Sequence, residues 1–155
     1  MCNTQSARRA FRSWLTRDDV RRVLDRLEGT HRLIGALLYC AGLRIMEAAR
    51  LRVKDVDFER REIMVREGKG AKDRVTVLPR NAIASLRAHL RGVRELHERD
   101  FADGFGAVYM PAALERKWRN AAREWGWQYV FPAPTRSPDP RGGVVRRHHL
   151  SDQTF

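Results

Sequence analysis

The first clear periodicity in the chain is a run of apolar residues spaced three and four positions apart, typical of one face of an amphipathic helix. Thr16 precedes this run and Asp19 follows three positions later, so the pair resembles a capping box with Asp in place of Glu. Gly29 is placed to end the helix. Its predicted apolar face consists of Val20, Val23, Leu24 and Leu27.

Two further helices are expected directly afterwards. Residues 31–41 are more uniformly apolar, which predicts a buried helix that Gly42 closes, and residues 45–51 predict a short third helix. Cys40 lies in the apolar stretch of the second helix and is interpreted as a small core residue.

The pattern then changes to short stretches rich in β-branched and apolar residues. Residues 53–58, 62–66 and 74–78 have this character and predict strands. The glycine-containing segment between the last two strands predicts a hairpin tip, and Pro79 ends the third strand. We therefore expect one small antiparallel sheet after the third helix.

Helical periodicity returns after Pro79. Residues 83–96 predict a long amphipathic helix, residues 101–109 a loop, and Pro111 opens another helix. The apolar stripe of that last helix is expected to comprise Leu114, Trp118, Ala121 and Trp125. Residues 129–131 predict a short extended piece. The expected fold class is α+β and mainly helical, with a small antiparallel sheet inserted among the helices.

Length and composition agree with one soluble domain. The chain has 155 residues, of which 43% are hydrophobic, enough for one domain with a core. No apolar run reaches the length of a membrane span, and residues 1–12 lack the apolar region of a signal peptide. We therefore expect a cytoplasmic protein without a membrane partner. Cys2 and Cys40 lie far apart and imply neither a disulfide framework nor a zinc site.

The charge indicates the class of partner. The net charge is +12, and 27 arginines stand against 4 lysines. A GC-rich genome would explain the ratio of arginine to lysine, but it would not explain the net charge. Such an excess repels itself in a folded protein and is tolerated where a polyanion binds. Nucleic acid is favoured over an acidic protein or a membrane surface.

Two motifs have the chemistry of phosphate binding. Arg44 follows a helix-ending glycine at the start of the third helix, where free backbone amides and a guanidinium together suit a phosphate. The alternative is a solvated pair between Arg44 and Glu47. Lys69 stands between two glycines at the hairpin tip, and such a lysine can protonate a leaving oxygen. The alternative there is a basic, solvated tip; the spacing is not that of a P-loop.

Together these motifs resemble the first half of the catalytic domain of the tyrosine recombinase (phage integrase) family. Further on, residues 114–117, 125–132 and 146–155 resemble the integron integrase branch, which carries an extra helical insertion, here about residues 101–131. The resemblance implies a linker or arm at residues 1–13 and an incomplete recombinase catalytic domain at 14–155. The stretches that carry the family resemblance are Leu43-Arg44-Ile45-Met46-Glu47-Ala48, Leu51-Arg52-Val53-Lys54-Asp55-Val56-Asp57-Phe58, Gly68-Lys69-Gly70-Ala71-Lys72-Asp73-Arg74 and Leu78-Pro79.

The resemblance also implies a mechanism. In this family a tyrosine attacks a phosphodiester and forms a 3′-phosphotyrosyl link without metal, ATP or any other cofactor. Arg44 would be the first catalytic arginine, which clamps the scissile phosphate, and Lys69 the catalytic lysine, which protonates the leaving 5′-oxygen; Glu47 would support them. Met46 departs from the small polar residue that is more usual there. Full-length relatives are expected to act as tetramers on attachment sites, including folded single-stranded hairpins.

Other parts of the family's active site are not found in the sequence. The His-x-x-Arg box, a further histidine and the nucleophilic tyrosine have no counterpart, because Tyr39, Tyr109 and Tyr129 lie in the wrong places. The chain alone is therefore expected to bind DNA without cleaving it. Apolar surface on the hairpin and on the second helix is expected to be exposed.

The integron branch suggests how extrahelical bases would be held. Trp127, Pro140, His148 and His149 are candidates to cradle such bases by stacking. The alternative is that Trp127 is a core residue and that the histidines cap a following helix. Further DNA contacts are expected from the basic residues Arg52, Lys54, Lys72, Arg74, Arg146 and Arg147.

Two other functions remain open at this stage. Glu67-Gly68-Lys69 spells the acid-x-lysine pattern of a metal-dependent nuclease, with Asp57 as a second ligand, although those sites lie within a strand and not at a glycine-rich tip. A DNA-binding regulator could use the first three helices. Magnesium-dependent nicking would indicate the nuclease, and sequence-specific duplex binding that survives loss of Lys69 would indicate the regulator.

Overall fold

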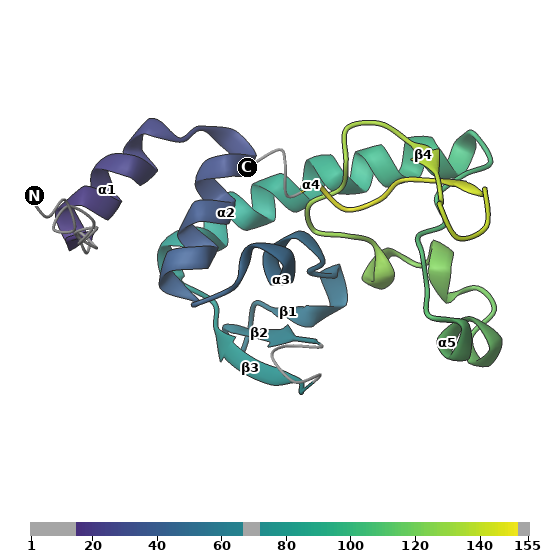
Figure 1. Ribbon diagram of the computed structural model, residues 1–155, viewed down its shortest axis with the longest axis horizontal. Coiled ribbons are helices and arrows are strands. Elements are labelled where there is room, and N and C mark those ends of the chain that lie inside the picture. Colours follow the sequence, from purple (N-terminus) through teal and green to yellow (C-terminus); the bar gives the residue numbers. More distant parts are fainter. Residues whose placement is uncertain (1–14, 67–71, 152–155) are drawn as a thin grey trace, which may run out of the picture.

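The computed structural model describes residues 15–66 and 72–151 (Figure 1). The linker or arm expected at residues 1–13 and the hairpin tip with Lys69 and Glu67 lie outside these residues. Three helices open the described chain: α1 Arg17–Arg26, α2 Gly29–Cys40 and α3 Ile45–Ala49.

The capping box at the start of α1 is confirmed. The Oγ1 of Thr16 accepts a hydrogen bond from the backbone N–H of Asp19 at 3.2 Å, and Asp19 accepts one from the backbone N–H of Thr16 at 3.0 Å. Gly42 closes α2 as expected, with a left-handed φ of 64° that favours glycine. Gly29 instead begins α2, and α1 ends earlier, at Arg26.

The three-stranded antiparallel sheet has the order β1-β2-β3. Residues 53–58 form less strand than expected: Val53–Asp55 is a 3-10 turn (η1), and only Val56–Asp57 pairs as β1. β2 is Glu62–Val65, and it pairs with β3, Arg74–Val77, in a register that ends at the Val65–Arg74 pair. The two strand ends that flank residues 67–71 are therefore held side by side.

The second half of the chain is built on one long helix, α4 Arg80–Ala102. Its N-terminal part passes behind α2 in Figure 1, and the later segments lie along its C-terminal half. These later elements are short: α5 Ala112–Lys117, the 3-10 turns η2 Ala121–Arg123 and η3 Trp125–Trp127, and the strands β4 Ser137–Pro138 and β5 Val145–Arg146. The mainly helical α+β class with a small antiparallel sheet is confirmed.

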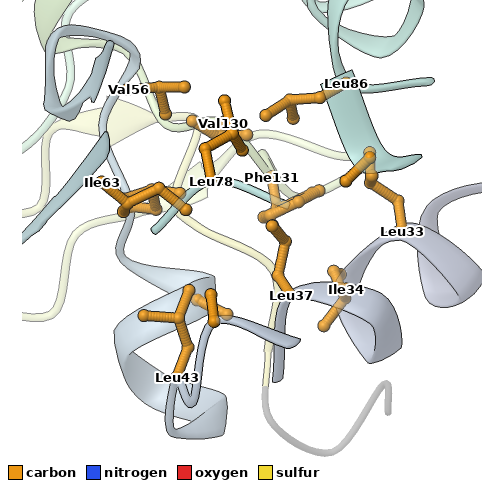
Figure 2. Packing of buried hydrophobic residues seen from close by; sticks show 14 of the residues in the cluster. Leu33, Ile34, Leu37, Leu43, Val56, Ile63, Leu78, Leu86, Val130 and Phe131 are labelled. Carbon is orange, nitrogen blue, oxygen red and sulfur yellow. The ribbon is translucent and has the colours of Figure 1, made fainter. Parts of the chain in front are cut away.

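The main core joins the two halves of the chain (Figure 2). Phe131 and Val130, from the late segment (residues 125–151), are fully buried with Leu37 of α2 and Leu86 of α4. Backbone hydrogen bonds hold this segment in place: Val130 donates to the carbonyl of Leu51, and Leu150 to the carbonyl of Phe131, both at 2.8 Å. The late segment is thus an integral part of the domain core.

Two packing predictions, for Cys40 and for the helix after Pro111, were wrong. None of the residues of α1 is buried. This helix packs mainly on α2, where Leu24 and Leu27 lie so close to Gly35 that a Cβ there would clash. Cys40 is exposed at the end of α2. The helix after Pro111 ends at Lys117, so Trp118 leaves the expected apolar stripe and is 46% exposed.

Some apolar side chains lie on the surface of the domain. Val75 and Val77 on β3 and Tyr39 on α2 are each more than half exposed, so apolar side chains do face outward on the two elements for which this was expected. Over residues 15–66 and 72–151, none of the helices combines the length and the apolar character that a membrane span requires.

Candidate nucleic-acid interface

Arg44 lies at the N-cap of α3 with most of its side chain in solvent. The side chain is 58% exposed, and its Nη1 lies 3.2 Å from Oε1 of Glu47, so the pair considered as the alternative is present. The backbone N–H of Arg44 also donates to Glu47 Oε2 at 2.8 Å. Arg44 is thus anchored at its backbone by the Glu47 carboxylate, while its guanidinium remains accessible to a phosphate.

Glu47 supports more than one arginine. Its side chain is only 8% exposed, and Oε2 also accepts a 2.7 Å hydrogen bond from Arg74 on β3. Burial opposes ionisation of this carboxyl, but the hydrogen bond from Arg44 and the charge of Arg74 outweigh burial, so the pKa of Glu47 lies below its ordinary value. Glu47 is therefore a carboxylate shared by two cations.

Two other candidate residues, Lys72 and Asp57, are among those that the structure describes. Lys72 is exposed just before β3, where it is accessible to DNA. Asp57, the second ligand of the nuclease alternative, caps the β1–β2 turn by accepting the backbone N–H groups of Glu59 and Arg60. In the part of the chain that the structure describes, no three His, Cys, Asp or Glu side chains are grouped as a metal site would need.

Arg52 points into the domain and not toward solvent. Its guanidinium donates to the carbonyls of Trp127 and Tyr109 at 2.7 and 2.9 Å, and it lies 3.8 Å from the ring centroid of Tyr129. Burial lowers the pKa of Arg52, although a guanidinium stays protonated at any ordinary pH. These contacts favour a structural role for Arg52, in which it joins the segment after α3 to the late segment.

Trp127 and Lys54 form a contact that the sequence did not indicate. The Nζ of Lys54 lies 2.9 Å from the ring centroid of Trp127, a cation–π arrangement, and the ring of Trp118 lies 6.2 Å away. Burial and the nearby charge of Arg66 lower the pKa of Lys54. Trp127 is half-buried, and it packs on a small second cluster with Met110, Ala121 and Ala122. A base that stacks on Trp127 must use the face opposite Lys54 or displace the ammonium.

Arg146 and Arg147 are also occupied within the fold. Arg147 donates to both carboxylate oxygens of Asp100 and to the carbonyls of Ala133 and Pro134. Arg146 donates to the carbonyl of Val108 at 2.8 Å. Like Arg52, these two arginines are placed to hold the late segment against the rest of the domain, and their contact with DNA stays a prediction.

The remaining base-cradle candidates lie on one stretch of the late segment. Pro140 is exposed in a tight turn between β4 and β5, where the buried Asp139 accepts the backbone N–H of Arg141 at 2.9 Å. The ring of His149 meets Tyr129 edge-on at 5.4 Å. The Nε2 of His148 is buried and has no hydrogen-bond partner among the described residues.

Asp100 is an anchor that the sequence pattern did not indicate. This aspartate is buried at the C-terminal end of α4, and the hydrogen bonds from Arg147 hold its pKa below the ordinary value. Arg136 adds a second cation at 3.6 Å. The residues around Asp100 give no local signal of this role, because its partner Arg147 lies 47 residues further along the chain.

Comparisons with known proteins give relatives of one kind. A protein described as "Integrase/recombinase" from Escherichia coli is 52% identical over 141 residues, which cover 91% of this chain and 42% of that protein. Tyrosine recombinase XerA from Thermococcus onnurineus is 49% identical over 79 residues, 49% of this chain and 28% of that protein. The chain thus spans about two fifths or less of these relatives.

The fold agrees with these sequence matches. A crystal structure of XerA recombinase superposes with a TM-score of 0.56 over 98% of this chain and 41% of that one, at 19% identity, so it supports the fold alone. The model of the phage integrase family matches residues 13–153, nearly the whole length. The chain therefore belongs to the phage integrase family of tyrosine recombinases.

Proposed function

We propose that this chain is the DNA-binding first part of the catalytic domain of an integron-type tyrosine recombinase. The observation that carries the proposal is Arg44, whose exposed guanidinium stands on a backbone fixed by the buried Glu47. A cation held in this way suits the scissile phosphate, where it would offset charge that develops on phosphorus. The net charge of +12 supports a polyanionic partner.

We also propose Lys69 as the proton donor to the leaving oxygen. Lys69 lies outside the described residues. Support comes from the strands on either side: the β2–β3 pairing continues to Val65 and Arg74, and Arg74 reaches Glu47 beside Arg44. By resemblance to the family, the full-length protein would act as a tetramer on attachment sites in the cytoplasm and would need no cofactor.

Tyr129 is poorly placed to be the nucleophile, because its phenol is buried and its oxygen accepts a hydrogen bond from Arg52 at 3.1 Å. Burial is also the leading cause that raises the pKa of Tyr129, which disfavours the phenolate. Tyr39 and Tyr109 do not match the position of the family's nucleophile either. We therefore propose that these 155 residues bind DNA without cleaving it, and that binding is the property to measure.

DNA affinity should fall steeply with salt, and Arg44→Ala should reduce both the affinity and the slope. Each neutralised phosphate contributes about 0.9 to the slope of log affinity against log salt, so loss of one contact should flatten it by about that amount. The affinity for a short duplex should fall about tenfold, as is usual for one charged hydrogen bond. Fluorescence anisotropy at several salt concentrations measures both quantities.

Arg60→Ala is the matched control, because Arg60 is exposed in the β1–β2 turn, at the other end of β2 from the Val65–Arg74 pair. It removes the same charge but should leave the slope nearly unchanged. An equal loss in both variants would mean that only the overall charge matters. A response to salt that is flat in the original protein would remove nucleic acid as the partner.

The integron assignment is tested by the shape of the DNA. If Trp127 stacks an extrahelical base, a hairpin with an unpaired bulge should bind more tightly than plain duplex, and Trp127→Ala should abolish this preference. One lost stack corresponds to about 1–3 kcal/mol of binding free energy. Competition binding of the two DNAs measures the difference. Equal weakening for both DNAs would identify Trp127 as a packing residue of the second cluster.

A further inference from the structure

Arg74 is placed where three segments of the fold meet. It is the first residue of β3, and its Nη2 donates to Glu47 Oε2 at 2.7 Å and to the carbonyl of Gly42 at 3.1 Å. Thr76, two residues further along β3, donates to the carbonyl of Ala41 at 2.7 Å. One face of β3 is thereby fixed to the end of α2 and to the start of α3.

The contact between Arg74 and Glu47 changes the net charge of the cluster that contains Arg44. Glu47 is one carboxylate between two guanidinium groups, so the cluster retains a net charge of +1. If Arg74 were absent, the Glu47 carboxylate would be compensated by Arg44 alone, whose Nη1 already lies 3.2 Å from Oε1. The cluster would then have no net charge to offer to a phosphate.

We propose that Arg74 is a positioning residue for Arg44: it satisfies the Glu47 carboxylate from the side of β3 and leaves the Arg44 guanidinium available to a DNA phosphate. Arg74 then acts through Glu47 and Arg44 and makes no phosphate contact of its own, in contrast to the DNA contact expected from the sequence. This inference rests on the proposed role of Arg44 in DNA binding.

A double-mutant cycle on the 155-residue chain tests the inference with a short duplex. Arg74→Met should weaken binding about tenfold and flatten the salt slope by about one contact when Arg44 is present, because the Arg44 contact is lost. In the Arg44→Ala background the same substitution should change the affinity by less than about twofold. Losses that add in the two backgrounds, with a slope decrease in both, would overturn the inference.

A second measurement needs no variant, so its result does not depend on whether a substituted chain folds. In the original protein, the side-chain Nε–H resonances of Arg44 and Arg74 can be followed by NMR as the duplex is added. Arg44 should shift on binding while Arg74 keeps its position, because Arg74 stays bonded to Glu47 and Gly42. A shift of Arg74 as large as that of Arg44 would also overturn the inference.

Failure of the inference can be told apart from failure of the proposed function. If Arg44→Ala itself leaves the affinity and the slope unchanged, the phosphate clamp is wrong and the inference falls with it. If Arg44→Ala weakens binding while Arg74→Met has an additive effect, only the positioning role is wrong. Arg60→Met, which removes the same charge from the exposed β1–β2 turn, serves as the control for a general charge effect. It should leave the affinity nearly unchanged.

Discussion

Phe131→Ala should lower the free energy of unfolding by about 3–5 kcal/mol, the usual cost of deleting a buried aromatic ring. Phe131 is 0% exposed and belongs to the cluster that includes Leu37 and Leu86 (Figure 2). The cavity would open between α2, α4 and the late segment. Urea denaturation followed by circular dichroism measures the change.

Phe101→Ala provides the control, because Phe101 lies at the end of α4 and is 54% exposed. Its loss should change the free energy of unfolding by about 0.5 kcal/mol or less. A loss below about 1 kcal/mol for Phe131→Ala would mean that the late segment is not part of the core. The expectation of a single domain over residues 14–155 would then fail.

The second large effect is expected at the Asp100–Arg147 pair. Both side chains are nearly buried, 7% and 13% exposed, and Arg147 binds both carboxylate oxygens. Asp100→Asn, which removes one charge and leaves Arg147 without its full partner, should lower the free energy of unfolding by about 3 kcal/mol. The double variant Asp100→Asn with Arg147→Met should lose less than the two single losses added together, because no unpaired charge remains.

The pair also predicts how stability depends on pH. Hydrogen bonds from Arg147 lower the pKa of Asp100 in the folded state below its unfolded value, about 3.9. The contribution of Asp100 is therefore fully present above that value and is lost as pH falls through the folded pKa. Unfolding measured between neutral and acidic pH should show a loss below about pH 4 that is smaller in Asp100→Asn. An equal acid dependence in both proteins would contradict this role of Asp100.

The elements and the Arg44 motif could be predicted because their causes are local. The capping box of Thr16 and Asp19, the three-residue step from Arg44 to Glu47 and the β-branched runs that form β2 and β3 depend on neighbours in the chain. Apolar spacing alone was misleading for the helix after Pro111, which was expected to continue through Trp118 and ends at Lys117.

The roles of the basic residues were decided only by the tertiary structure. The sequence shows 27 arginines of similar character, but it does not show which of them meet a carboxylate or a carbonyl in the fold. Arg74 meets Glu47 across 27 residues, Arg147 meets Asp100 across 47, and Arg52 meets Tyr129 across 77. A guanidinium is occupied or available according to which distant groups the packed core brings within hydrogen-bond distance of it, and no local spacing encodes that arrangement.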